Sequence, residues 1–278
     1  MICFPNAKIN IGLRVTGKRP DGYHNIESIL YPVGLTDILE ISEQKKDSGK
    51  GISLDTTGIK IDSPPEENLV FRTAELLRKE YSIPPLDIHL HKLIPTGSGL
   101  GGGSSDTAFL LRLLNNKFSI RITEEKLHAI ASGLGSDCPF FLNRTSAFIS
   151  GRGENIKRIS LNLSQFYLVI VYPGIHIDTG LAYSRITPSK PGLSLQKLIK
   201  YPVSLWKENI FNDFEKPVFS KYPNIKKIKE KLYSMGAIYS SLTGSGSAVY
   251  GLFDKKTETE GQFEHYLVWQ EELLQFQH

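Results

Sequence analysis

Residues 95–106 read PTGSGLGGGSSD, and this run decides how the rest of the chain is interpreted. Five glycines lie within residues 97–103. Without Cβ atoms, their backbone N–H groups can approach an anion closely and adopt the positive-φ turns that aim them inward. Residues 86–90 alternate between apolar and polar side chains, as a strand does, and residues 105–115 have the apolar spacing of a helix. The sequence therefore predicts a phosphate-binding loop between a strand and a helix N-terminus.

The residues after the glycines are of the types that cap helices. Ser104, Ser105 and Asp106 stand where the apolar period begins. Their side chains can accept hydrogen bonds from first-turn N–H groups. We therefore expect these residues to begin the helix.

Other glycine motifs fit the run less well. The glycine spacing satisfies the dinucleotide pattern G-x-G-x-x-G, but no parallel strand ending in an acidic residue follows about 20 positions on. A P-loop needs Lys-Ser or Lys-Thr after the glycines, and the sequence has neither there. A flexible linker remains the alternative, but such linkers are rarely joined directly to a strand and a capped helix.

Composition indicates a soluble protein of ordinary type. The chain has 278 residues, a formal net charge of +4 and Lys and Arg residues that are dispersed rather than clustered. We therefore expect no nucleic-acid partner. Cys3 and Cys138 are the only cysteines in the sequence, which favours a reducing compartment. No apolar run is long enough for a leader or a membrane span, so we expect a cytoplasmic protein without a membrane partner.

The remaining pattern predicts an α+β protein with two halves. We divide it into residues 1–156 and 157–278. Polar or turn-rich breaks are expected at residues 45–51 and 188–193. The predicted strands cover residues 7–15, 38–41, 86–90, 166–172, 237–242 and 247–253, the last two forming a hairpin. The predicted helices cover residues 66–79, 105–115, 123–133, 225–233 and, closing the chain, 258–276.

Four further motifs accompany the glycine loop in a fixed order. They read PNAKINIGL at residues 5–13, RPDGYH at 19–24, GSDCPFF at 135–141 and TGSG at 243–246. Together with the loop they resemble the GHMP kinases, a family of small-molecule kinases. The flanking motifs are most similar to those of members that act on a cytidine diphosphate-linked methylerythritol.

The resemblance implies a fold and a reaction. The fold is a two-domain GHMP kinase fold, with a ribosomal-S5-like N-terminal domain, a ferredoxin-like C-terminal domain and the active site between them. The implied reaction uses ATP to phosphorylate the 2-hydroxyl of the erythritol unit. Phosphoryl transfer also implies Mg²⁺, which neutralises charge on the β- and γ-phosphates. The sequence does not identify the protein ligands of the metal.

The matching positions supply two expected catalytic residues. Asp137 lies in the GSDCP stretch, and a carboxylate there could orient the substrate hydroxyl and accept its proton. Lys8 lies on the first strand, and its ammonium could keep Asp137 ionised and stabilise charge on the attacking oxygen. Pattern alone allows a turn aspartate and a solvated strand face instead. Cys138 lacks a partner histidine in any recognised arrangement, which favours a buried thiol over a nucleophile.

The resemblance also implies residues that bind substrate. Asn10 shares a strand face with Lys8 and is expected to contact the substrate. Tyr23 and His24 follow a turn, where an aromatic ring beside a hydrogen-bonding ring suits cytosine. Thr179 and Tyr183 match the opposite side of the base pocket more loosely. Ordinary half-buried packing is the alternative for these rings.

ATP is expected to contact the glycine loop and two asparagines. Asn68 and Asn115 match positions near adenine, although the first could cap a helix and the second could end one. The expected loop contacts are Pro95, Gly97, Gly99, Leu100, Gly101, Gly102, Gly103, Ser104 and Ser105.

Two alternative functions stay open at this point. Another GHMP kinase, of mevalonate or homoserine type, would have no use for the Tyr23–His24 pair. A non-catalytic GHMP-fold protein that binds nucleotide would have no need of both Lys8 and Asp137. The expected partner is a small-molecule substrate, and the chain is expected to be a monomer or a homodimer.

Overall fold

The chain folds into two compact units, each assembled from separate stretches of sequence. The computed structural model describes residues 1–44, 51–188 and 192–273. The first unit contains residues 1–7, 35–96 and 101–144, and the second contains residues 8–34, 97–100 and 145–278. The predicted division at residues 156/157 follows the chain rather than these units, and it stays a prediction.

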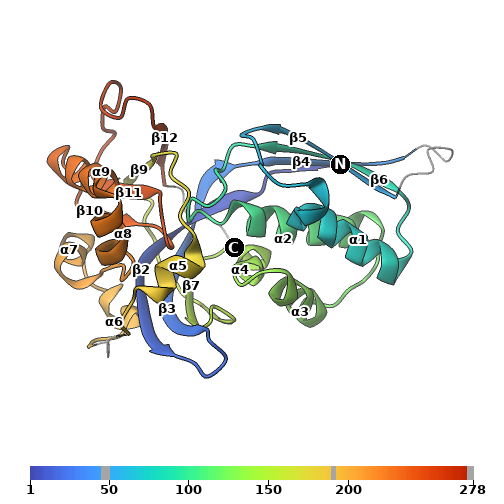
Figure 1. Cartoon of the computed structure of the whole chain (residues 1–278), viewed down its shortest axis with the longest axis horizontal. Helices are drawn as coiled ribbons and strands as arrows, with labels where there is room; N and C mark the ends of the chain where they lie inside the picture. Colours follow the sequence, from blue (N-terminus) through green and yellow to red (C-terminus); the bar gives the residue numbers. More distant parts are fainter. Residues whose placement is uncertain (45–50, 189–191, 274–278) are drawn as a thin grey trace. The chain divides into compact units, whose positions relative to one another are not determined.

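The first unit is built on a four-stranded sheet with the order β1-β4-β6-β5 (Figure 1). Its strands are β1 (Ile2–Cys3), β4 (Ile38–Glu43), β5 (Ile52–Gly58) and β6 (Leu86–Lys92). β6 pairs antiparallel with β4 and parallel with β5. Its apolar residues alternate in burial with its polar ones, as predicted for residues 86–90. The predicted break at residues 45–51 lies almost wholly outside the described residues.

The helices of this unit pack on one another, and the first of them also packs on β5 of the sheet. They are α1 (Leu69–Tyr81), α2 (Gly102–Lys117), α3 (Glu124–Leu134) and the short α4 (Cys138–Asn143), with a 3-10 turn at Pro65–Glu67. α1 begins at Asn68, whose side chain accepts a hydrogen bond from Val70 N. α3 begins at Thr123, whose hydroxyl accepts one from Lys126 N. The helices predicted over residues 66–79 and 123–133 are therefore confirmed, with α1 beginning at Leu69 rather than at residue 66.

The predicted start of α2 was wrong. The helix begins at Gly102, with Gly101 as N-cap at φ +78° and no side-chain cap. Ser104, Ser105 and Asp106 lie inside the first turns instead of before them. The reason is tertiary, because Asp106 is buried and bonds to a lysine of β6.

Lys92, Asp37 and Asp106 form a buried charged cluster in the first unit. The Lys92 ammonium bonds to a carboxylate oxygen of Asp37 and lies 2.7 Å from Oδ2 of Asp106. The other Asp37 oxygen accepts hydrogen bonds from Leu93 N and Ile94 N, at 2.6 and 2.8 Å. Within the described chain, Oδ1 of Asp106 has no hydrogen-bond partner. The cluster fixes the first turns of α2 against the end of β6 and carries one carboxylate more than its single cation can neutralise.

This excess charge should make the stability of the first unit depend on pH. Burial raises the pKa of Asp106 to about 7, although the Lys92 ammonium opposes the rise. An unfolded chain loses the same proton near the ordinary aspartate pKa of about 4. Between these values the folded state binds more protons, so this group lowers the free energy of unfolding as pH rises. We expect Asp106→Asn to remove that pH dependence.

The measurement is urea unfolding of wild type and Asp106→Asn at pH values from 5 to 8. We expect the free energy of unfolding of Asp106→Asn to increase relative to that of wild type as pH rises. A buried amide without an acceptor costs about 1–3 kcal/mol, but that cost does not change with pH. A difference that stays constant across the range would contradict the prediction.

The second unit contains two sheets (Figure 1). The first has the order β2-β3-β7-β8, from β2 (Asn6–Lys18), β3 (His24–Thr36), β7 (Ala147–Gly151) and β8 (Asn155–Arg158). The second has the order β10-β11-β9-β12, from β9 (Tyr167–Tyr172), β10 (Tyr239–Leu242), β11 (Val249–Phe253) and β12 (Leu267–Glu272), with antiparallel pairs throughout. The predicted hairpin is β10–β11.

The helices of this unit are short, apart from α9. They are α5 (Thr179–Ser184), α6 (Leu195–Leu198), α7 (Trp206–Asn209), α8 (Glu215–Lys221) and α9 (Pro223–Ser234), with a 3-10 turn at Val203–Leu205. α9 confirms the helix predicted over residues 225–233, and its buried residues Ile225, Ile228 and Leu232 have helical spacing. The predicted break at residues 188–193 lies partly outside the described residues.

The closing helix predicted over residues 258–276 was wrong. Residues 267–272 form β12, which pairs antiparallel with β9 from Leu267↔Tyr172 to Glu272↔Tyr167. The backbone of β9 needs hydrogen-bond partners on this side, and strand pairing overrode the weak helical period of the tail. No helix within the described ranges is long and apolar enough to cross a membrane.

Candidate active site

The glycine loop has the backbone that its sequence predicts. Gly97, Gly99 and Gly101 all have positive φ, at 64°, 82° and 78°. α2 then begins directly, and the first N–H groups of a helix have no acceptor within it. Gly103 is exposed, and a Cβ atom there would meet nothing within 4 Å. The run therefore presents backbone donors at an open position, as a phosphate cradle requires.

The middle of this loop is fixed by its carbonyl groups. Ser98 O accepts a hydrogen bond from Ala248 N, and Leu100 O accepts one from Lys8 N, both at 3.0 Å. At Gly99, a Cβ atom would lie 2.0 Å from the carbonyl oxygen of Thr243. Only glycine fits this contact and this positive φ without strain. The loop therefore depends on close backbone contact with the turn after β10.

Lys8 lies in a buried polar cluster that includes this loop. Its ammonium donates to Gly99 O at 2.6 Å and to Asn10 Oδ1 at 2.5 Å. Thr243 Oγ1 lies 3.2 Å from the same Asn10 oxygen and 3.1 Å from Gly99 O. The Asn10 amide nitrogen donates to Ser28 Oγ at 2.9 Å. Lys8 is thus a buried cation held at the phosphate loop, and a solvated strand face is excluded for it.

Asn10 therefore orients the lysine through contacts that the pattern could not reveal. Both its side-chain oxygen and its amide nitrogen have protein partners, and it is 3% exposed. Its expected contact with substrate stays a prediction. Ser28, which completes the chain of bonds by donating to Gly12 O at 2.6 Å, lies in no motif and gave no sequence signal.

Asp137 stands directly before α4. It is the N-cap of that helix but makes no side-chain capping hydrogen bond to it, and it is partly exposed. Asp137 thus lies in a turn at a helix terminus, which the sequence pattern also allowed, and its catalytic role stays a prediction. Burial raises the pKa of the neighbouring Cys138 thiol to about 11, against a lowering hydrogen bond with Ser104. Cys138 is buried, as the sequence predicts, and a raised pKa disfavours the thiolate that a nucleophile requires.

Aromatic side chains gather at the start of β3. The rings of His24 and Tyr183 are stacked, with centroids 5.1 Å apart and planes 17° apart. Tyr183 also meets Phe214 edge-on at 4.8 Å. The Tyr23 ring is 59% exposed, and the guanidinium of Arg152 lies 4.9 Å from its centroid. The structure thus brings the predicted His24 and Tyr183 rings together with Phe214 and places Arg152 at the Tyr23 ring. The sequence analysis did not select Phe214 or Arg152.

The two asparagines predicted to lie near adenine form hydrogen bonds within the protein. Asn68 caps α1 through its side-chain oxygen, 2.9 Å from Val70 N. The side chain of Asn115 bonds to the backbone N–H and carbonyl of Ile122 at 2.9 and 3.3 Å. Their contacts with adenine stay predictions. Thr179 is the first residue of α5, and its side chain lies outside the described part.

The residues of the glycine loop are suited to binding the phosphates of a nucleoside triphosphate. Positive-φ glycines, an open position at Gly103 and a helix N-terminus form an anion cradle. Within the described residues, the buried Ser105 hydroxyl has no hydrogen-bond partner, so a polar ligand could satisfy it. No group of three or more His, Cys, Asp or Glu side chains in the described ranges could hold a metal.

Family models match both halves of the chain. The GHMP kinase N-terminal domain matches residues 68–144, and the GHMP kinase C-terminal domain matches residues 197–264. The chain belongs to the GHMP kinases. The resemblance seen in its motifs and the predicted α+β GHMP kinase fold are therefore confirmed.

Curated relatives show which kind of GHMP kinase the chain is similar to. A 4-diphosphocytidyl-2-C-methyl-D-erythritol kinase from Parabacteroides distasonis is 48% identical over 275 residues, covering 98% of this chain and all of that protein. One from Bacteroides fragilis is 48% identical over 274 residues with the same coverage. The chain is thus similar over nearly its whole length to kinases of a single named activity.

Solved structures agree with this placement. A crystal structure of 4-(cytidine 5'-diphospho)-2C-methyl-D-erythritol kinase superposes with a TM-score of 0.77 at 31% identity, covering 91% of this chain and 90% of the other. Mevalonate kinase from Methanococcus jannaschii superposes with a TM-score of 0.67 at 14% identity, covering 97% of both chains. The second likeness is one of fold alone.

Proposed function

We propose that this protein is an ATP-dependent kinase that phosphorylates the 2-hydroxyl of 4-diphosphocytidyl-2-C-methyl-D-erythritol. The relatives' shared name supports the substrate. The observation that carries the reaction is the buried Lys8 ammonium bonded to Gly99 O, since it places a fixed positive charge at the phosphate loop. The product belongs to the non-mevalonate route to isoprenoid precursors.

The transfer step needs a proton acceptor and charge stabilisation. In the proposed reaction the substrate hydroxyl oxygen attacks the γ-phosphorus of ATP, and the bond from that phosphorus to the bridging oxygen of ADP breaks. Asp137 orients the hydroxyl and takes its proton. Lys8 stabilises the negative charge that develops on the attacking oxygen. The loop amides hold the phosphates, and Mg²⁺ would supply further positive charge against them.

We assign recognition of the cytosine to the aromatic group at β3. The exposed Tyr23 ring offers a stacking face, and base–aromatic stacking contributes about 1–3 kcal/mol. His24 provides ring nitrogens for the base edge, and its stacking on Tyr183 supports an orientation fixed before substrate binds. Thr179 is proposed to lie on the same side of the base as Tyr183.

The experiment is an ADP-release assay with ATP, Mg²⁺ and one acceptor at a time. We expect turnover with the cytidylyl substrate and at least about 100-fold lower kcat/KM with mevalonate, homoserine or galactose, because these lack a base to stack. Preference for one of the simple acceptors would keep the fold and overturn the assigned substrate. ATP binding without turnover of any acceptor would favour the non-catalytic alternative.

The cellular setting belongs to the same proposal. We place the enzyme in the cytoplasm, acting on a small molecule as a monomer or homodimer, without nucleic-acid or membrane partners. Both cysteines are free thiols, which supports a reducing compartment.

A further inference from the structure

Residues 212–215, Asn-Asp-Phe-Glu, contact several parts of the proposed site and belong to none of the motifs considered above. We call them the NDFE segment. It joins α7 to α8 and is paired with β2, since Asp213 N donates to Leu13 O at 2.8 Å. The Asp213 carboxylate accepts a hydrogen bond from Val15 N at 2.7 Å. The segment is thus bound to the strand that carries Lys8 and Asn10.

Asn212 and Glu215 hold the turn after β10 from one side. Asn212 Nδ2 donates to Leu242 O at 2.8 Å and to Gly244 O at 2.9 Å, and its side chain is buried. Glu215 Oε1 accepts from Leu242 N at 3.0 Å, while its other oxygen binds Lys229 Nζ at 2.7 Å. Three polar backbone groups of Leu242 and Gly244, on either side of Thr243, are therefore fixed by two side chains.

The same turn holds the catalytic lysine from the other side. Thr243 lies between Leu242 and Gly244, and its hydroxyl contacts Asn10 Oδ1 and Gly99 O, the two acceptors of the Lys8 ammonium. Thr243 O also lies against the Cα of Gly99. A shift of the turn would therefore move the acceptors that aim the ammonium, without removing any group that touches substrate.

Phe214 contacts a different part of the proposed site. Its ring meets Tyr183 edge-on at 4.8 Å, and Tyr183 stacks on His24 at 5.1 Å. Phe214 is 1% exposed, so its ring is fixed by packing. It supports the aromatic group that we assign to cytosine.

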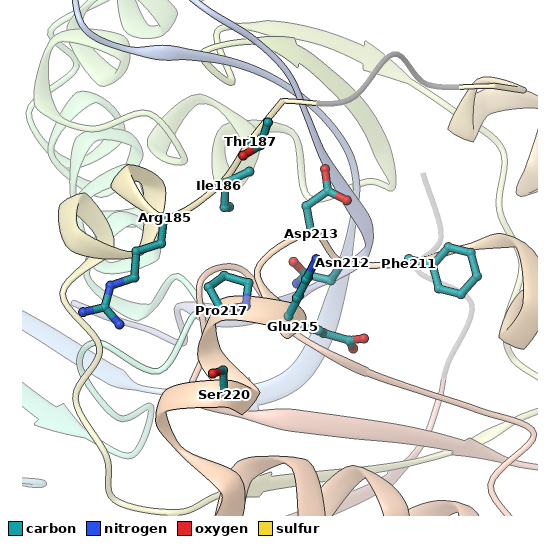
Figure 2. Close-up of a pocket in the computed structure, with 10 residues that line it drawn as sticks. Arg185, Ile186, Thr187, Phe211, Asn212, Asp213, Glu215, Pro217 and Ser220 are labelled. Carbon is teal, nitrogen blue, oxygen red and sulfur yellow. The ribbon is translucent and has the colours of Figure 1, made fainter.

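We infer that the NDFE segment is a positioning element with two separable roles. Asn212 positions Lys8 through the turn after β10, and Phe214 positions Tyr183 and His24. The inference rests on the proposed function for its kinetic part. Asn212, Asp213 and Glu215 also line a cavity of about 550 Å³ (Figure 2). Lys216 follows the segment in the sequence, lines the same cavity and is exposed. Lys216→Ala is therefore a neighbouring control.

The test compares Asn212→Ala, Phe214→Leu and Lys216→Ala in steady-state kinetics with ATP and the cytidylyl substrate. For Asn212→Ala we expect kcat to fall about 10-fold or more, with KM for the cytidylyl substrate within about twofold. For Phe214→Leu we expect that KM to rise roughly 3- to 10-fold, as for the loss of one aromatic contact, with kcat and KM for ATP within about twofold. Lys216→Ala should match wild type.

The two variants are thus expected to differ in which constant changes, kcat in one and KM in the other. General destabilisation would instead change the same constants in both variants. If Asn212→Ala does not fold, Asn212→Asp replaces it. That variant keeps the oxygen that accepts from Phe214 N at 2.9 Å and loses the two donors to the turn. Equal changes of kcat and KM in both variants, or changes no larger than those of Lys216→Ala, would overturn the inference.

A second measurement does not need turnover. Amide hydrogen exchange at Thr243 and Gly246, which donate to Ala248 O and Thr243 O, should be faster in the Asn212 variant than in wild type. Phe214→Leu and Lys216→Ala should leave it unchanged. Unchanged exchange in the Asn212 variant would overturn its role even if the enzyme proved to act on another acceptor. An inactive wild type with the expected exchange would instead overturn the proposed function.

Discussion

Asp137→Asn is expected to lower kcat by about 10²- to 10⁴-fold, the range that a positioned general base contributes. The amide keeps the size and the hydrogen-bonding shape of the carboxylate but cannot accept the substrate proton. Because Asp137 makes no side-chain capping bond to α4, the helix should tolerate the change. KM for ATP should stay close to the wild-type value, since the phosphates are held by the glycine loop. The measurement is ADP release under saturating ATP.

Asp62→Asn provides the matched control. It makes the same chemical change at an exposed carboxylate of the first unit, whose partner is the exposed Lys60. It should leave kcat unchanged. If Asp137→Asn retained more than about a tenth of the wild-type kcat, proton acceptance by Asp137 would be rejected.

Lys8→Met should have the second large effect, a loss of about 10²- to 10³-fold in kcat. Methionine fills a similar volume, but it removes the charge that is proposed to stabilise the attacking oxygen. Asn10 Oδ1 and Gly99 O would still have the Thr243 hydroxyl within hydrogen-bond distance, at 3.2 and 3.1 Å. The loop should therefore keep its conformation, and ATP binding measured by calorimetry should weaken much less than kcat falls.

The double variant tests whether the two residues act on one step. If Lys8 and Asp137 serve the same proton transfer, Lys8→Met combined with Asp137→Asn should be little worse than the poorer single variant. Losses that multiply would show independent roles. An unchanged kcat in Lys8→Met would contradict a catalytic role for Lys8. The hydrogen bonds of Lys8 to Asn10 and Gly99 would then be purely structural.

Several features of this chain could be predicted because they rest on local rules. Thr123 caps α3, and β6 alternates, as side-chain type and period require. The glycine loop adopts the positive φ that its sequence permits. The closing strand could not be predicted in this way, since residues 267–272 become a strand only by pairing with β9. Local propensity does not specify which strand edge is available.

The candidate site likewise has features that the sequence predicted and features that it did not. Motif order identified Lys8 and the glycine loop, but not the contacts that bury the lysine. The lysine donates to Asn10 and Gly99, and the hydroxyl of Thr243, more than two hundred positions later, contacts the same two acceptors. Arg152 and Phe214 gave no signal because packing with the predicted rings is what makes them relevant.

The sequence indicated the family and the reaction type through the resemblance of its ordered motifs. It also predicted the backbone of the phosphate loop, because glycines act through local conformation. Only the tertiary structure decided that Asp106 is buried with Lys92 and that Asn212 holds the turn beside Lys8. Buried polar groups must find hydrogen-bond partners, and those partners come from wherever folding brings another segment.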